Sequence, residues 1–274
     1  MQSVPFEPRG DAPLAAIDMG SNSFRLEIGQ ISRGRYKRID YLKETVRLGG
    51  GLDAEGRLTE EAQLRGLACL SRFALRLRGS EVQRVRAVAT QTLREATNRD
   101  AFLARARTVL GHPIEVISGR EEARLIFAGV ARLQPSERPR LVIDIGGRST
   151  EMIAGQGRTP RVAESFQVGS VSLSMRHFPD GRYTAEGFRA AQIAAGAELE
   201  EALQPFAPGQ WIEALGASGT VGAFATSLVP GDYVAAIVPV NLLVTSSTWN
   251  DPQPIATQVR HVGTIIVGGI ALIG

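Results

Sequence analysis

Cysteine and histidine are scarce in this chain of 274 residues. There is one cysteine, Cys69, and there are three scattered histidines, His112, His177 and His261. A single cysteine excludes an internal disulfide framework and is typical of a reducing compartment, so we expect a cytoplasmic protein. No spacing of cysteine and histidine resembles a zinc site. Cys69 lies in a helical pattern and is interpreted as a small buried apolar residue rather than a nucleophile.

A membrane-spanning run is missing as well. The apolar stretch 234–245 is short and is interrupted by Pro239 and Asn241, which makes it a poor membrane span. Residues 1–13 are polar and show no signal-peptide pattern. The formal charge of +3 is compatible with an anionic substrate but is too small to predict nucleic-acid binding. We therefore expect an ordinary globular protein whose partners include neither a membrane nor a nucleic acid.

The sequence does contain a strand-and-loop motif that occurs twice. The first copy is Asp18-Met19-Gly20-Ser21-Asn22-Ser23-Phe24, and the second is Asp144-Ile145-Gly146-Gly147-Arg148-Ser149-Thr150. Each follows an apolar run that is typical of a buried strand. Backbone N–H groups of a Gly/Ser turn bind anions, and a carboxylate at the strand end can hold a metal ion or water. The repeat predicts two similar half-domains facing each other across a cleft that suits a phosphate chain.

Strands and helices alternate along the chain, which predicts an α/β fold. We divide it into domains 1–131 and 132–274, with a polar linker at 135–139. Gly49-Gly50-Gly51 is interpreted as a flexible turn, and the charge-poor segment after 218 as short strands and loops. Besides the strands before the two loops, the patterns predict strands near 25–29, 36–45, 82–89, 114–117, 151–154, 161–168, 212–215 and 264–267, and helices over 59–78, from 94 to 110, from about 120 onward and over 185–203.

Three carboxylates are candidate magnesium ligands: Asp18, Asp144 and Glu151. Magnesium prefers oxygen ligands and uses one or two carboxylates together with waters and phosphates. Glu151 follows Asp144 by seven residues, so a hairpin would return its carboxylate towards the same loop. The alternative is that each strand-end aspartate merely caps its own turn. The duplication favours the metal site.

An acid pair stands in the run Ser118-Gly119-Arg120-Glu121-Glu122-Ala123. Acids in a first helical turn also arise because they complement the helix dipole, so this motif alone leaves both interpretations open.

Taken together, these segments resemble the exopolyphosphatase / guanosine pentaphosphate phosphohydrolase family. The similarity covers about residues 14–222, and the motifs stand in the order in which the family has them. The matching segments are 16–24, 90–94, 116–125, 142–151, 169–172 and 216–220.

The resemblance implies an actin-like, ribonuclease-H-like fold of two domains facing across a cleft. It also implies removal of terminal phosphate from inorganic polyphosphate or guanosine pentaphosphate with Mg²⁺. Glu122 matches the catalytic glutamate, and Asp18, Asp144 and Glu151 match acidic positions around phosphate and metal. The phosphate-binding positions that match are Ser21, Asn22, Ser23, Arg94, Gly146, Gly147 and Ser149, with Arg148 as an added cation; Arg25 and Arg120 are further candidates for lining a phosphate channel.

Two features depart from the family pattern. The second loop normally reads Gly-Gly-Gly-Ser-Thr, whereas Arg148 occupies the third position here, where a positive φ would be costly. The family's charged helical segment after residue 220 is replaced by a charge-poor stretch, although 268–273 resembles its closing strand. The C-terminal helical domains of the long family forms, which bind polyphosphate and favour dimers, are not expected here. A homodimer is left open.

The sequence favours a Mg²⁺-dependent exopolyphosphatase in which Glu122 activates water. Guanosine pentaphosphate hydrolysis is the first alternative, because both substrates present the same terminal group. A non-catalytic protein that binds polyphosphate or an alarmone is the second, favoured by Arg148 and the unusual tail and opposed by the retained acids. An actin-like kinase is a third, opposed by the acid-pair motif and the missing sugar-site signature.

Overall fold

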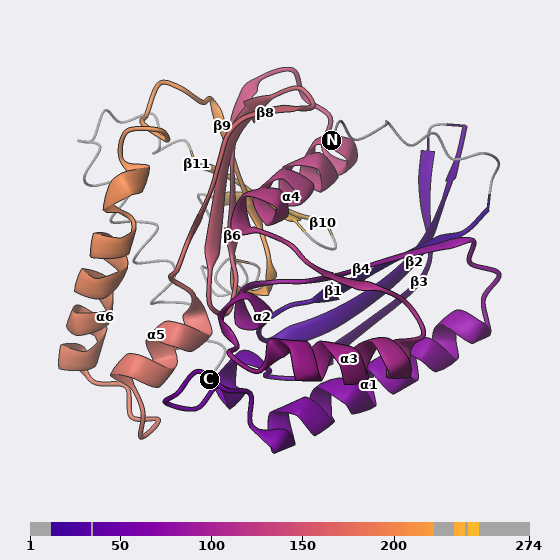
Figure 1. Cartoon of the computed structure of the whole chain (residues 1–274). Helices are drawn as coiled ribbons and strands as arrows, with labels where there is room; N and C mark the ends of the chain where they lie inside the picture. Colours follow the sequence, from indigo (N-terminus) through magenta and orange to yellow (C-terminus); the bar gives the residue numbers. More distant parts are fainter. Residues whose placement is uncertain (1–11, 34, 222–232, 239–240, 247–274) are drawn as a thin grey trace. The chain divides into compact units, whose positions relative to one another are not determined.

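A computed structural model of the chain describes residues 12–33, 35–221, 233–238 and 241–246 (Figure 1). The chain divides into two compact units, Met1–Ile117 and Ser118–Gly274. The sequence analysis placed the division after residue 131. The structure places it after Ile117, so the helix Gly119–Leu133 lies in the second unit. The expected cleft concerns their relative placement and stays a prediction.

One five-stranded sheet forms the first unit, in the order β3-β2-β1-β4-β5. Strands β1, β2 and β3 are antiparallel neighbours, and β4 and β5 continue the sheet parallel to β1. This is the strand order of a ribonuclease-H-like, actin-like domain. The bounds are β1 (Leu14–Met19), β2 (Ser23–Ser32), β3 (Arg35–Thr45), β4 (Arg84–Ala89) and β5 (Ile114–Val116).

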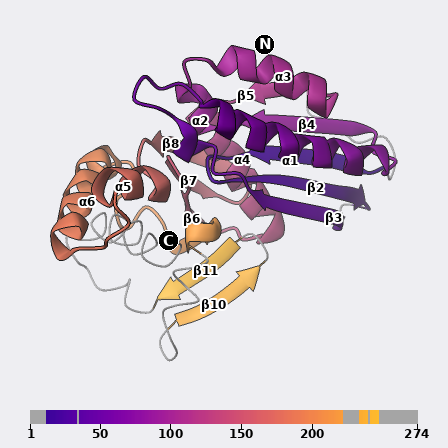
Figure 2. The same ribbon diagram turned by 90° about the horizontal axis from the view of Figure 1, so that it is seen from below.

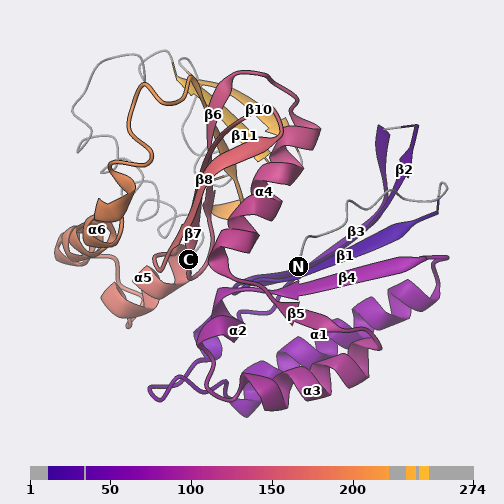
Figure 3. The same cartoon turned by 45° about the horizontal axis from the view of Figure 1, so that its top comes forward.

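Two helices cover one face of this sheet. Helices α1 (Glu60–Arg78) and α3 (Arg99–Leu110) lie side by side on it (Figure 3). Alternate strand residues such as Ile17 and Met19 are 1% exposed and pack against Phe73 and Phe102 of the helices. The residues between them, Asp18 included, therefore lie on the opposite face of the sheet.

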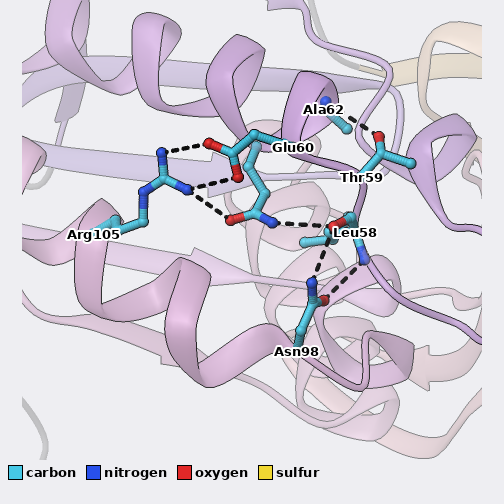
Figure 4. Close-up of polar contacts among 7 residues, drawn as sticks. Leu58, Thr59, Glu60, Ala62, Asn98 and Arg105 are labelled. Carbon is cyan, nitrogen blue, oxygen red and sulfur yellow. Dashed lines mark hydrogen bonds and ion pairs between the residues drawn. The ribbon is translucent and has the colours of Figure 1, made fainter.

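The sequence predicted one helix through residue 110, but the structure has two. Helix α2 (Gln91–Glu95) ends before a turn, and α3 begins at Arg99. The Asn98 side chain holds this turn, because its oxygen accepts from Leu58 N at 2.8 Å and its nitrogen donates to Leu58 O at 3.0 Å (Figure 4). Asn98 immediately precedes α3 but does not cap it; its side chain instead ties the turn between the two helices to Leu58.

Figure 4 also shows how α1 and α3 are joined. Thr59 caps α1 by accepting from Ala62 N, and Arg105 of α3 donates to both carboxylate oxygens of Glu60. Gly49–Gly51, predicted as a flexible turn, is a short 3₁₀ helix packed against α1. A Cβ on Gly51 would lie 2.2 Å from the Ala62 side chain, so this segment needs glycine for close packing.

The second unit repeats the arrangement around a six-stranded sheet in the order β10-β11-β9-β6-β7-β8. Here β6, β7 and β8 are antiparallel neighbours and β9 is parallel to β6, as β4 is to β1. The next strand differs, since β11 is antiparallel to β9 and forms a hairpin with β10 (Figure 2). The bounds are β6 (Pro139–Ile145), β7 (Thr150–Gln156), β8 (Thr159–Phe166), β9 (Glu213–Ala217), β10 (Tyr233–Val238) and β11 (Asn241–Ser246).

Both faces of this sheet are covered. Helix α4 (Gly119–Leu133) packs Ala123 and Phe127 against Val142 and Ile153 on one face. Helices α5 (Ser170–His177) and α6 (Ala185–Glu198), followed by a 3₁₀ turn at Glu200–Ala202, cover the other. The buried apolar residues of α4 belong to the core cluster of this sheet, which is the physical reason that the helix belongs to the second unit.

Most predicted elements are present, but α5 was not predicted. The expectation of short strands after residue 218 is met by β10 and β11, while the predicted strand 264–267 lies outside the described residues. No helix within the described ranges has the length and apolar character that a bilayer crossing requires.

Candidate phosphate and metal site

The first loop, between β1 and β2, is held by the backbone that follows β3. Val46 N and Arg47 N donate to Asn22 O at 3.0 and 2.8 Å, and Gly49 N donates to Ser21 O at 2.8 Å. In a trans peptide the next N–H points opposite to the carbonyl. The N–H groups of Asn22 and Ser23 therefore point away from residues 46–49, as donors for an anion would.

The second loop, between β6 and β7, is held in the same way by the first turn of α5. Ser170 N donates to Gly146 O at 3.0 Å, and Val171 N and Ser172 N donate to Gly147 O at 2.7 and 3.0 Å. By the same geometry, the N–H groups of Gly147 and Arg148 point away from α5. The repeated sequence motif thus has a repeated structure.

Glycine is required at two positions around the second loop. A Cβ on Gly146 would lie 2.9 Å from Ser149 O, and one on Gly169 would lie 2.5 Å from Arg148 N. Gly20 in the first loop is the counterpart of Gly146, with 3.0 Å to Ser23 O. These close approaches explain the glycines that the motif shares.

Arg148 replaces a glycine without backbone strain. Among the described residues, the non-glycine residues with positive φ are Arg33, Arg47 and Ser218, and Arg148 is not one of them. The departure from the family pattern therefore leaves the loop conformation accessible. Ser218, in the matching segment 216–220, has φ 135°, a conformation that costs energy and that clusters at functional sites.

Asp18 stands at the end of β1, directly opposite Arg25 of β2. Arg25 Nη1 lies 3.2 Å from Asp18 Oδ2. Burial raises the pKa of the Asp18 carboxyl, and the Arg25 guanidinium opposes that rise. The predicted metal ligand is thus already paired with a predicted phosphate ligand.

Asp144 and Glu151 are directly opposite each other in the β6–β7 hairpin, as the seven-residue spacing predicted. By strand alternation they share the face of Val142 and Ile153, which is the face that α4 covers. Directly opposed side chains on one face have Cβ atoms about 4.5–5.5 Å apart. Two carboxylates at that separation form an oxygen donor pair that fits a hard divalent cation.

Glu151 is 1% exposed, and its orientation is fixed by the neighbouring strand. Ser165 of β8 is its register partner, and Ser165 Oγ donates to Glu151 Oε1 at 2.7 Å. Ser165 was not predicted from the sequence, because its contact with Glu151 depends on the register of a second hairpin.

Glu122 lies in the first turn of α4, on the helix that covers Asp144 and Glu151. Ser118 caps this helix by accepting from Glu121 N at 3.2 Å. At the start of α4, Arg120 pairs with Glu164 of β8, at 3.0 Å for both contacts. At its end, Gln134 O accepts from Arg140 Nη1, near the start of strand β6, at 2.7 Å.

The direction of α4 follows from these contacts. Its first turn lies towards the strand ends that carry the second loop. Glu122, Asp144 and Glu151 are thus brought to one end of one face, within one unit. The Arg120 guanidinium forms an ion pair with Glu164, which makes Arg120 a weaker candidate for a phosphate ligand.

The segment 90–94 supports the first loop. Thr92 Oγ1 donates to Ser21 Oγ at 2.8 Å, and both residues are buried. Arg94 donates to Gln91 Oε1 at 2.9 Å through Nε and to Ile117 O at 2.9 Å through Nη1. Thr92 lies in the matching segment 90–94, but its contact with the loop was not predicted from the sequence.

The structure therefore divides the predicted site residues between its units. Within the described part of the chain, no group of three or more His, Cys, Asp or Glu side chains forms a ready metal cage. Asp144 and Glu151 are the pair that fits best. The first unit contains Asp18, Ser21, Asn22, Ser23 and Arg94, and the second contains Glu122, Asp144, Gly146, Gly147, Arg148, Ser149 and Glu151.

Comparison with known proteins gives matches over most of the chain. A model described as the Ppx/GppA phosphatase family matches residues 28–230. A putative exopolyphosphatase of Haemophilus influenzae is 38% identical over 257 residues, which are 94% of this chain and 78% of that protein. A guanosine-5'-triphosphate,3'-diphosphate pyrophosphatase of Photobacterium profundum is 44% identical over 258 residues, again 94% of this chain but only 50% of the relative's length.

A solved structure from Aquifex aeolicus, of a PPX-GPPA enzyme, has a TM-score of 0.68 and 26% identity. The match covers 96% of this chain and 91% of that chain, so both units are included.

Proposed function

Since the chain belongs to the Ppx/GppA phosphatase family, we propose that it is an exopolyphosphatase that hydrolyses the terminal phosphoanhydride bond of inorganic polyphosphate. The name of the Haemophilus influenzae relative, a putative exopolyphosphatase, supports this substrate. The observation that carries the proposal is the repeated loop beside strand-end carboxylates. In each copy the loop carbonyl oxygens accept hydrogen bonds from the protein's own backbone, which leaves loop N–H groups pointing the other way.

In this proposal the loop N–H groups of Asn22 and Ser23, and those of Gly147 and Arg148, bind phosphate oxygens and stabilise their charge in the transition state. The Glu122 carboxylate orients a water molecule and takes its proton. The water oxygen forms a bond to the terminal phosphorus while the bridging P–O bond breaks. The products are orthophosphate and a chain shorter by one phosphate.

Asp144 and Glu151 would hold Mg²⁺ in the second unit, and Asp18 is the acidic candidate in the first. The donor set fits, because a buried carboxylate opposed by a second carboxylate offers oxygen ligands at the end of one strand pair. A bound Mg²⁺ would neutralise charge on the phosphate oxygens.

Guanosine pentaphosphate hydrolysis is the second candidate. The 44% identity to the Photobacterium profundum relative favours it. Both substrates end in the same phosphoanhydride, so the loops and carboxylates serve either. A non-catalytic protein that binds polyphosphate or an alarmone is a third candidate. The presence of Glu122, Asp144 and Glu151 argues against it.

The test is phosphate release with Mg²⁺ from polyphosphate and, separately, from guanosine pentaphosphate. Glu122→Gln is expected to lower turnover by about 10²–10⁴-fold, the usual contribution of a positioned base, with binding retained. Glu121→Gln is the matched control, because it removes the same charge one residue earlier. Binding without release from either substrate would favour the non-catalytic function, and unchanged turnover in Glu122→Gln would remove the assigned base.

A further inference from the structure

A row of side chains crosses the face of the first sheet opposite α1 and α3. The register places Val88 of β4, Asp18 of β1, Arg25 of β2 and Lys43 of β3 side by side. Asp18, Arg25 and Lys43 are the charged members. The row begins at the strand end that leads into the first loop, and Arg25 follows Ser23 by two residues.

Arg25 and Lys43 are directly opposed cations. Like charges facing each other across two strands lower the stability of a sheet. Asp18 pairs with Arg25 at 3.2 Å. Within the part of the chain that the structure describes, Lys43 has no ion pair. The row thus has two cations and one carboxylate, an excess of one positive charge.

We propose that Arg25 and Lys43 form an oligophosphate subsite beside the first loop, which binds a phosphate adjacent to the terminal one. This rests on the proposed phosphohydrolase function and adds Lys43 to it. An anionic phosphate between the two side chains would replace their repulsion by two attractions.

The two side chains suit this ligand in different ways. The Arg25 guanidinium offers a planar set of donors that matches phosphate oxygens, and Lys43 offers a compact point charge with three donors. Desolvation and, after it, the neighbouring Arg25 lower the pKa of the Lys43 ammonium. A bound phosphate would favour the charged form of Lys43 and so oppose this lowering of its pKa.

The first experiment replaces the lysine. Lys43→Met is expected to raise KM for polyphosphate about tenfold, the equivalent of 1.4 kcal/mol in binding, with kcat within about twofold. Because the substitution removes a like-charge contact, Tm should stay equal or rise. Lys43→Arg keeps the charge and should restore most of the affinity.

Lys37→Met is the matched control. Lys37 and Lys43 are the chain's two lysines, and both lie in β3. Lys37 pairs with Gln30, away from the row, so its loss should leave KM unchanged. Equal effects of the two substitutions, or no effect of Lys43→Met, would overturn the subsite.

A second experiment does not depend on turnover. Inorganic tripolyphosphate should slow acylation of Lys43 by an amine-reactive ester several-fold but leave Lys37 unaffected, with sodium chloride at equal ionic strength as the reference. Protection of Lys43 in a protein that hydrolyses nothing would support the subsite while the hydrolase function failed. Hydrolysis of polyphosphate, together with equal labelling of both lysines, would support the hydrolase function and overturn the subsite.

Discussion

The two units place chemically different residues in the same row of the same topology. In the first unit the row is Asp18, Arg25 and Lys43. In the second it is Asp144, Glu151 and Ser165, read across β6, β7 and β8 in the same order. Both rows begin with the aspartate before the loop. The next position is a cation in one unit and a buried carboxylate in the other.

This difference indicates a division of labour on a duplicated scaffold. A carboxylate beside cations favours an anionic ligand, and paired carboxylates with a hydroxyl donor favour a hard cation. The loops themselves are alike, because each has its carbonyls held by the segment after the third strand. We infer that the two loops give both units an anion-binding site. The rows give the units different preferences, for an anionic ligand in the first and for a hard cation in the second.

The largest expected effect comes from removing the second row's buried charge. Glu151→Gln should lower turnover at fixed Mg²⁺ by about a hundredfold or more, since a bound divalent cation contributes several kcal/mol to charge stabilisation. Gln is nearly isosteric and relieves the repulsion from Asp144, so Tm should not fall. Activity titrated with Mg²⁺ measures the effect.

Arg25→Gln is the counterpart in the first row. It should raise KM for polyphosphate and leave the Mg²⁺ midpoint in place. If both substitutions shifted the same parameter, the proposed division between the rows would be wrong.

A smaller effect is expected at the third position of the second row. Ser165→Ala removes the donor that orients Glu151 at 2.7 Å. Residues that orient a metal ligand typically contribute 10–100-fold to metal affinity, so binding of Mn²⁺ to the substrate-free protein should weaken by about that factor. Ser165→Thr keeps the hydroxyl and should bind Mn²⁺ almost normally. A structural role alone would lower Tm in Ser165→Ala without changing Mn²⁺ affinity.

The sequence predicted the parts of the site that are local. Asp18 with its loop, Asp144 with its loop, and the return of Glu151 to Asp144 each depend on fewer than ten consecutive residues. Their strand–loop–strand pattern fixes them, and the structure has all three. The family resemblance placed Glu122 in the helix that the structure calls α4.

The contacts that the sequence did not reveal all join distant segments. Ser165 reaches Glu151 through a second hairpin, Thr92 reaches Ser21 across 71 residues, and Lys43 reaches the row through the β2–β3 register. The unit to which α4 belongs depends on which sheet its apolar side packs against. An amphipathic pattern does not specify that sheet.

The first unit also differs in how its covering helices are held. Asn98 makes two hydrogen bonds to the Leu58 backbone, while in the second unit Phe178, Tyr183 and Phe188 form an aromatic cluster next to α5 and α6. Asn98→Ala should lower the free energy of unfolding of the first unit by about 1–3 kcal/mol, the sum of two such bonds.

Asn98→Asp keeps the acceptor and loses the donor, so its effect should be intermediate. Hydrogen exchange resolved by segment would locate the loss in residues 12–117. An equal loss of protection in both units would show that they unfold together.

The smallest effect concerns acid stability. Hydrogen bonds from Arg76 and Arg72 of α1 lower the pKa values of Asp40 and Glu44 of β3 below their ordinary values of 3.8 and 4.5. A lowered pKa in the folded state stabilises above the ordinary pKa, and that contribution is lost as the pH falls through the folded value. Each pair contributes about 1 kcal/mol or less, because surface ion pairs are weak.

In the second unit, the corresponding lowered pKa belongs to Asp180, whose partner Arg182 is two residues away and joins no separate elements. Between pH 5 and pH 3, segment-resolved hydrogen exchange should therefore show a larger loss of protection in the first unit. Arg72→Gln with Arg76→Gln should remove most of that difference, and Arg182→Gln should not. Asp18 acts with the opposite sign, because its raised pKa makes its contribution disappear as the pH rises, so the measured difference is a lower bound on the effect of the α1 pairs.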